Sequence, residues 1–152
     1  MMMMDFVPSF QSAKDFLGFE THFLKDQLLV ILDDPVRAFK CKNGNIGITQ
    51  MSAHDQDRLD NYMDMMCRTF PFGIGMVKRT WNRETVFFNG KNVSYYDKQK
   101  ERLNEWPARG AHCRVAITVK GLKVDKERNV SFIWDICQLK LADIITFDAC
   151  VL

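Results

Sequence analysis

The strongest constraint on the fold is a strict alternation of side chains in the last third of the chain. Residues 112–120 place four apolar side chains on one side: Cys113, Val115, Ile117 and Val119. Successive side chains of a β-strand point to opposite faces, so this pattern predicts a half-buried strand. After Gly121 and a short polar connection, residues 130–141 predict a second strand with one apolar face.

Shorter segments upstream predict more strands, joined by turns. The expected strands are residues 28–32, 36–42, 46–49, 85–88 and 91–96. Asn43-Gly44-Asn45 separates the second strand from the third, and Asn89-Gly90 separates the last two. Because these turn residues tolerate positive φ, we expect a tight turn, and so a β-hairpin, at both places.

One principal helix is predicted at about residues 53–69. Ser52 can cap its first turn, and Asp55 completes a capping-box-like pattern. Six apolar residues recur at helical spacing and form one face: Leu59, Tyr62, Met63, Met66, Cys67 and Phe70. Four aspartates lie mostly away from that face, on an expected solvated face and in the N-terminal turn, where the helix dipole favours negative charge: Asp55, Asp57, Asp60 and Asp64.

Several short strands with one helix between them predict a mainly β fold. A small five-stranded barrel of the oligonucleotide-binding (OB) type accommodates this set of elements. Residues 1–152 are expected to form a single domain, with an N-terminal arm at residues 1–24 and a C-terminal appendage at residues 142–152. A β-sandwich is the alternative, because one sequence does not determine strand order.

The composition predicts an intracellular protein of a reducing compartment. No apolar run approaches the ~20 residues of a membrane-spanning helix, and residues 1–5 lack the regions of a signal peptide. The five cysteines are irregularly spaced and form no Cys-x-x-Cys pair, so we expect free thiols. We expect no membrane association.

Motifs for catalysis are lacking in the sequence. It contains no phosphate-binding glycine loop, no dinucleotide-binding fingerprint and no nucleophile elbow. The three histidines and five cysteines do not complete a zinc-ligand pattern. We therefore expect no catalytic residues, no metal and no cofactor.

The charge distribution favours an anionic partner. Residues 71–128 carry thirteen Lys/Arg against six Asp/Glu, whereas residues 1–70 carry seven against ten. A basic middle third between acidic ends is typical of an anion-binding face. Aromatic residues are interleaved with these cations, and single-stranded nucleic acid is held by cations that follow its phosphates and by rings that stack on its bases.

The candidate nucleic-acid-binding residues follow from this combination. They are Lys78, Arg79, Trp81, Arg83, Phe88, Lys91, Tyr95, Trp106, Arg109, Arg114, Lys120 and Lys123. Trp81 lies between basic and polar neighbours and is the leading candidate for an exposed ring. In the Phe87-Phe88 and Tyr95-Tyr96 pairs one ring is expected in the core, and Trp106 could instead clamp a loop.

The stretch from Gly110 to Leu141 resembles the closing part of single-stranded DNA-binding proteins of large DNA viruses and some phages. The matching positions are Gly110, Val115, Ile117, Val119, Gly121, Trp134 and Gln138. An upstream helix followed by a tryptophan, here residues 62–70 and Trp81, is also similar. The resemblance implies an OB barrel and non-enzymatic, sequence-tolerant binding in replication and recombination, with replication proteins as further partners. For a viral protein, the expected location is the host cytoplasm or nucleus. The strongly acidic tail of that family is lacking, since residues 142–152 contain only Asp143 and Asp148.

Sequence reasoning therefore predicts a non-catalytic single-stranded DNA-binding protein. Single-stranded RNA is the other candidate ligand, because a contact to a 2′-hydroxyl leaves no mark in one sequence. The alternative function is a virion or assembly protein that uses its β scaffold for protein contacts. Homo-oligomer contacts are expected from the N-terminal arm or from the C-terminal residues.

Overall fold

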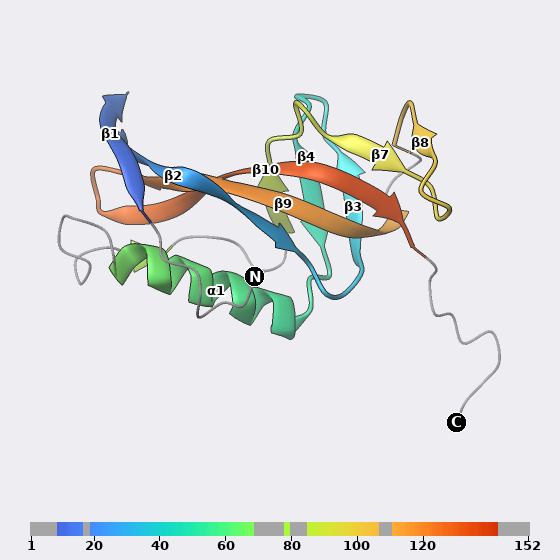
Figure 1. The fold of residues 1–152 in the computed structure, drawn as a ribbon, viewed down its shortest axis with the longest axis horizontal. Helices are drawn as coiled ribbons and strands as arrows, with labels where there is room; N and C mark the ends of the chain where they lie inside the picture. The colour runs from blue at the N-terminus through green and yellow to red at the C-terminus, as the bar shows by residue number, and fades with distance from the viewer. Residues whose placement is uncertain (1–8, 17–18, 69–77, 80–84, 107–110, 143–152) are drawn as a thin grey trace.

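The fold is that of a computed structural model, which describes residues 9–16, 19–68, 78–79, 85–106 and 111–142. These residues form one helix and ten strands that belong to a single sheet (Figure 1). The elements are β1 (Phe10–Phe16), β2 (Phe19–Ile31), β3 (Val36–Lys40), β4 (Ile46–Thr49), α1 (Ala53–Arg68), β5 (Lys78–Arg79), β6 (Thr85–Phe88), β7 (Ser94–Tyr96), β8 (Arg102–Leu103), β9 (Ala111–Val124) and β10 (Asn129–Leu141).

The two long strands β9 and β10 form the centre of the sheet. They pair antiparallel along almost their whole length, from Val124↔Val130 to Cys113↔Leu141. The other edge of β9 carries β2 and then β3, both antiparallel to it. β1 pairs back onto β2, which begins within the expected N-terminal arm and continues without a break to Ile31.

A branch of shorter strands leaves this centre at β3. β4 pairs with β3, and β6 pairs with β4, all antiparallel. The end of β6 returns to β10 through a single parallel bridge, Asn89↔Asp135, and Ile136 N–H donates to the Asn89 carbonyl at 3.0 Å. β7 and β5 pair parallel to other parts of the same edge of β10, and β8 pairs with β7.

The prediction of a mainly β fold with one principal helix is confirmed, and the five-stranded barrel is not. The ladders of the described residues leave an open sheet, because β9 and β10 are long enough to pair with several short strands each. The predicted hairpin at Asn43-Gly44-Asn45 is confirmed: Gly44 has a φ of 87°, and Cys41 N–H donates to the Asn45 carbonyl at 2.8 Å.

The predicted hairpin at Asn89-Gly90 is wrong. β6 and β7 flank this turn, but β6 pairs with β4 and β7 pairs with β10. β6 pairs along its length with β4, and β7 pairs along its length with β10, whereas a hairpin would rest on the local contacts of the turn. Gly121 also differs from expectation, since it lies inside β9 rather than after it, where a Cβ would collide with the backbone of His22 on β2.

The helix α1 confirms its predicted start and, within one residue, its predicted end. Ser52 caps it: the Asp55 N–H donates to Ser52 Oγ at 3.1 Å. The expectation that Asp55 is solvated is wrong, because its side chain is fully buried. Its carboxylate accepts the N–H groups of Asp33 and Asp34, both at 3.0 Å, and pairs with Arg58 at 3.0 Å. No helix in the described part of the chain is long and apolar enough to span a membrane.

The core lies between α1 and the inner face of the sheet. The helix contributes Leu59, Met63 and Met66, and the strands contribute alternate residues such as Ile117 and Ile136. The alternation predicted for residues 113–119 is confirmed, since its four apolar side chains are all buried. The side chains between them point outward, which leaves the outer face of the sheet for function.

Candidate nucleic-acid interface

Two phenylalanine rings meet on the outer face of β3, β4 and β6. Phe39 pairs with Gly47, and Gly47 pairs with Phe87, so the three residues form one row across the three strands. The Phe39 ring lies over Gly47, in the space that a side chain would otherwise fill. It meets the Phe87 ring edge to face, with the centroids 6.2 Å apart and the planes at 89°.

Phe87 is the exposed member of this row. Its side chain is 53% exposed, although it is as large and apolar as its buried neighbour Phe88. The backbone of Phe87 is held in place, because the Trp134 indole N–H donates to its carbonyl at 3.3 Å. An exposed ring on a fixed backbone can stack on a nucleobase, which contributes about 1–3 kcal/mol per base.

Cations lie on both sides of the aromatic row. Two residues before Phe39 on β3 is the exposed Arg37, whose Nε–H donates to His112 Nε2 on β9 at 3.1 Å. On the other side of the row, the turn at residues 43–45 contacts the turn at residues 89–90, since a Cβ on Gly90 would lie 2.6 Å from the Gly44 carbonyl oxygen. The exposed Lys42 and Lys91 directly flank these turns. We call this set the aromatic face: Phe39, Gly47, Phe87, Arg37, Lys42 and Lys91.

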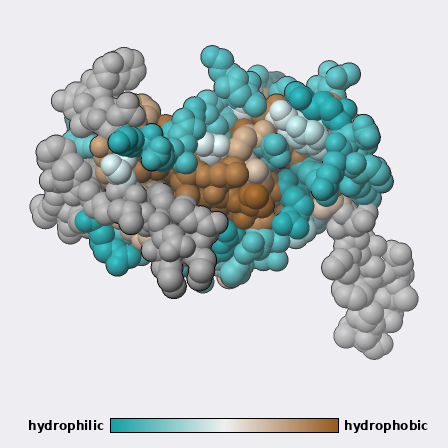
Figure 2. Space-filling view, in the orientation of Figure 1, coloured by the Kyte–Doolittle hydropathy of each residue, from teal (hydrophilic) through white to brown (hydrophobic). Residues whose placement is uncertain are grey.

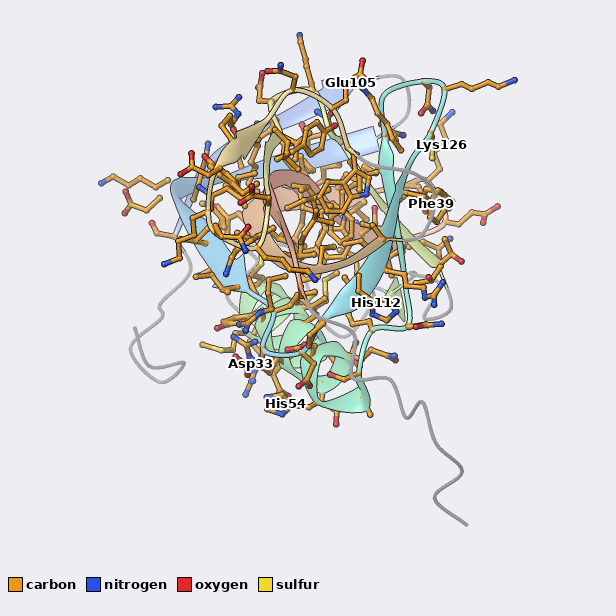
Figure 3. The ribbon with its side chains drawn as sticks, turned by 90° about the vertical axis from the view of Figure 1, so that its right-hand side faces the viewer. Asp33, Phe39, His54, Glu105, His112 and Lys126 are labelled. Atoms are coloured by element: carbon orange, nitrogen blue, oxygen red, sulfur yellow. The ribbon has the colours of Figure 1, made fainter. Side chains whose placement is uncertain are left out.

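In Figure 3, His112 lies between Phe39 and a polar cluster at the start of α1. That cluster consists of Asp33, His54 and Asp55. One side-chain atom of each, a ring nitrogen or a carboxylate oxygen that could bind a metal ion, lies within 4.8 Å of the others. Its oxygens already have partners: His54 Nε2–H donates to Asp33 at 2.7 Å, and Asp55 holds backbone N–H groups and Arg58. These contacts hold the connection between β2 and β3 against the start of α1, which accounts for the cluster.

The pKa values in this cluster follow the hydrogen bond. The bond from His54 lowers the pKa of Asp33, and the charge of Arg58 lowers it further. The same bond raises the pKa of His54, with the charges of Asp33, Asp55 and Asp34 adding to it. Both side chains are more than half exposed, so solvent weakens the pair.

Two predicted stacking residues are corrected by the structure. Phe88 is 1% exposed and Tyr95 is 7% exposed, so both rings belong to the core and cannot receive a base. Their neighbours Phe87 and Tyr96 point outward instead, as strand alternation requires. Trp106 is half-buried: its indole N–H donates to the Ala38 carbonyl at 2.9 Å, and its ring packs on Tyr95.

The predicted cations are spread over several parts of the fold. Lys91 lies on the aromatic face, and Arg114 and Lys123 are exposed on β9. Lys120 pairs with Asp135 at 2.6 Å, which compensates its charge. Trp81, Arg83 and Arg109 lie outside the described residues; Lys78 and Arg79 form β5, but their side chains are not described.

The sequence analysis did not include Arg37, Phe39 and Phe87 among its candidate binding residues. Alternation within residues 36–40 and 85–88 places Phe39 and Phe87 opposite the core side chains Ala38 and Phe88. That alternation was visible in the sequence, but it does not say which of the two faces is buried. Only the partner strand β4, with Gly47 between the rings, brings the two phenylalanines together.

Comparisons with protein-family models, with curated proteins and with solved structures find no match to this chain.

Proposed function

We propose that this protein binds single-stranded nucleic acid, without catalysis, on the aromatic face. The observation that supports this most directly is the Phe39–Gly47–Phe87 row, with an exposed ring at one end and cations on either side. Exposed rings receive unstacked bases, and Lys or Arg side chains at the edges neutralise the phosphates between them. Bases inside a duplex do not offer such faces, so a single strand fits this surface better.

The order of the strands supports the same location. Five strands occur along the chain in the order β3, β4, β6, β9 and β10, with other elements between them. The Asn89↔Asp135 bridge links the residue that follows β6 to β10. An OB fold is a partly open five-stranded barrel that binds oligonucleotides on the face of its second and third strands. We propose that these five strands correspond to such a barrel, in which case β4 and β6 carry the binding face.

We further propose single-stranded DNA as the ligand, in DNA replication or recombination of a viral or phage type. This part of the proposal rests on the resemblance of residues 110–141 to the viral and phage proteins. RNA is distinguished from DNA by contacts to the 2′-hydroxyl. Parallel titrations with DNA and RNA strands of the same sequence therefore decide between the two ligands.

The test is the anisotropy of a labelled oligo-dT strand titrated with the protein at several salt concentrations. Each neutralised phosphate of a single strand is expected to contribute a slope of about −0.7 to the plot of log affinity against log salt. We expect binding at low salt and a steep loss between ~50 and ~300 mM salt. A flat anisotropy at low salt would overturn the proposed function.

A second candidate function is assembly through protein contacts. Figure 2 shows an apolar patch in the middle of one face of the molecule. Two large apolar side chains near the end of β2, Leu29 and Ile31, are 59% and 51% exposed. Exposed apolar residues side by side on a strand are typical of a contact surface. Sedimentation of the wild type and of Leu29→Asp tests this: self-association that the substitution abolishes would favour assembly.

A further inference from the structure

A second row of side chains crosses the other branch of the sheet. On β8, Arg102 pairs with Tyr96 of β7; Tyr96 pairs with Lys140 of β10; and Lys140 pairs with Arg114 of β9. The guanidinium carbon of Arg102 lies 6.0 Å from the centroid of the Tyr96 ring. Since neighbouring strands are ~4.8 Å apart, this basic row extends for about 14 Å.

The residues of the basic row point outward. Directly paired residues on neighbouring strands lie on the same face of a sheet. The adjacent row, Val115, Leu139 and Tyr95, is buried in the core, so the basic row faces solvent. The row lies on four strands, none of which carries the Phe39–Gly47–Phe87 row.

A pocket of roughly 380 Å³ opens next to the basic row. Three cations line it, namely Lys100, Arg114 and Lys140. The polar Gln138 and the apolar Ile31, Val115 and Ala116 line the rest. The volume falls in the range of pockets that hold small ligands, and the lining combines apolar surface with a few convergent polar groups.

The pocket lining contains three cations and no carboxylate, although the charge of Arg114 also acts on Asp33, which is not part of the lining. Within the described part of the chain, no ion pair involves Lys100, Arg114 or Lys140. Arg114 donates one weak hydrogen bond, at 3.4 Å, to the Leu32 carbonyl. Like charges in one pocket repel one another, so an anion bound there would be stabilised.

The position of Lys100 is imposed by its turn. Lys100 has a φ of 69°, and its N–H donates to the Asp97 carbonyl at 3.1 Å. The Asp97 carboxylate accepts hydrogen bonds from the N–H groups of Gln99 and Glu101, both at 2.9 Å, which stabilises the turn around Lys100. A left-handed conformation costs about 1–2 kcal/mol for a residue with a side chain, and this turn offsets that cost.

We propose that this pocket is a nucleotide-binding subsite, in which Lys100, Arg114 and Lys140 hold a phosphate group. The sugar and base of the same nucleotide lie against Ile31 and Ala116. The ligand is either one nucleotide of a bound single strand or a free nucleotide, since both present the same phosphate chemistry. The first case rests on the proposed function, and it would let a strand continue from the aromatic face onto the basic row.

The test compares the double variant Lys100→Gln/Lys140→Gln with a matched control, Lys25→Gln/Lys126→Gln. Both variants lose two exposed or half-exposed lysines, and the control lysines lie elsewhere on the fold. Each full-length protein is titrated with oligo-dT and, separately, with thymidine monophosphate, while backbone amide shifts are followed by NMR. For the strand, we expect the pocket variant to reduce the slope of log affinity against log salt by up to about 0.7, the contribution of one phosphate contact.

The outcomes separate the two proposals. Ligand-dependent shifts at residues 114–116 and 138–140 that disappear in the pocket variant and persist in the control support the subsite. Shifts of this kind with thymidine monophosphate alone support the subsite for a free nucleotide and count against the strand. If oligo-dT binds and the pocket variant behaves like the control, the subsite is wrong while the proposed function stands. If neither ligand binds, both are wrong.

Discussion

Phe39 and Phe87 belong to strands that are not neighbours, yet their rings meet edge to face because Gly47 lies between them. The glycine leaves open the space that the Phe39 ring occupies, and the two centroids are 6.2 Å apart. Edge-to-face pairs of aromatic rings are worth about 0.5–1.5 kcal/mol beyond their buried area. The pair is therefore a fixed surface, in which one ring supports the exposed ring beside it.

Replacing Phe87 with alanine should weaken binding of oligo-dT by about 5- to 160-fold, the equivalent of losing one stacked base at about 1–3 kcal/mol. The fold should change little, because the ring is 53% exposed. Anisotropy titration measures the affinity, and urea denaturation measures the stability. Phe23→Ala is the matched control, since Phe23 is also exposed but lies on β2. Equal losses of affinity in the two variants would contradict the assignment of the aromatic face.

Replacing Gly47 with alanine should displace the Phe39 ring, because the new methyl group would occupy the place of its far edge. A ring at the end of a side chain can move, so we expect reduced binding of oligo-dT in a protein that still folds. The variant Gly47→Ala should have no further effect on binding when Phe39 is already alanine. A double-mutant cycle measures this; additive losses of affinity would show that Gly47 acts by another route.

Replacing Asp55 with alanine should destabilise the fold by about 3 kcal/mol or more, because it removes a buried carboxylate and leaves its hydrogen-bond and ion-pair partners unpaired. The buried carboxylate holds Arg58 and the backbone of Asp33 and Asp34. Asp57→Ala, two residues along the helix and exposed, should change stability by less than about 1 kcal/mol. Urea denaturation of both variants makes the comparison, and similar midpoints would refute the structural role of Asp55.

The Asp33–His54 pair should give a measurable dependence on pH. The pKa of His54 is raised above its ordinary 6.5, so its contribution to stability is complete below pH 6.5 and is lost as pH rises through the raised pKa. The pKa of Asp33 is lowered below 3.8, so its contribution is present above that value and is lost as pH falls. An NMR titration of His54 measures the first effect. The substitution Asp33→Asn should return the pKa of His54 toward 6.5. An unchanged pKa would exclude the pair as the cause of the raised value.

The thiol of Cys113 should not react in the native protein. Burial raises its pKa to about 12, so it remains protonated at pH 8, and the side chain is inaccessible. Cys41 is half-buried and should be alkylated before Cys113. Iodoacetamide labelling followed by mass spectrometry, with and without urea, measures the order. Rapid labelling of Cys113 in the absence of urea would indicate that β9 opens readily.

Local patterns in the sequence were sufficient for most of the secondary structure. Ser52 marked the start of α1, the turn at Gly44 marked the β3–β4 hairpin, and alternation marked the buried face of residues 113–119. These features depend on neighbours a few residues apart, so a single sequence contains them. The same reasoning failed at Asn89-Gly90, because the strands beside that turn found partners far away in the chain.

The sequence predicted the types of residue in the candidate site but not which residues form it. The sequence by itself determined that cations and aromatic residues are concentrated in the middle third, and that one ring of each adjacent pair would face outward. The tertiary structure alone decided which ring it was, because the sheet has two faces and only packing against distant side chains, Trp134 on Phe88 and Trp106 on Tyr95, places one ring of each pair in the core. It also brought Phe39 beside Phe87, and Arg114 beside Lys140, since strand pairing joins residues whose separation in sequence carries no record of their contact.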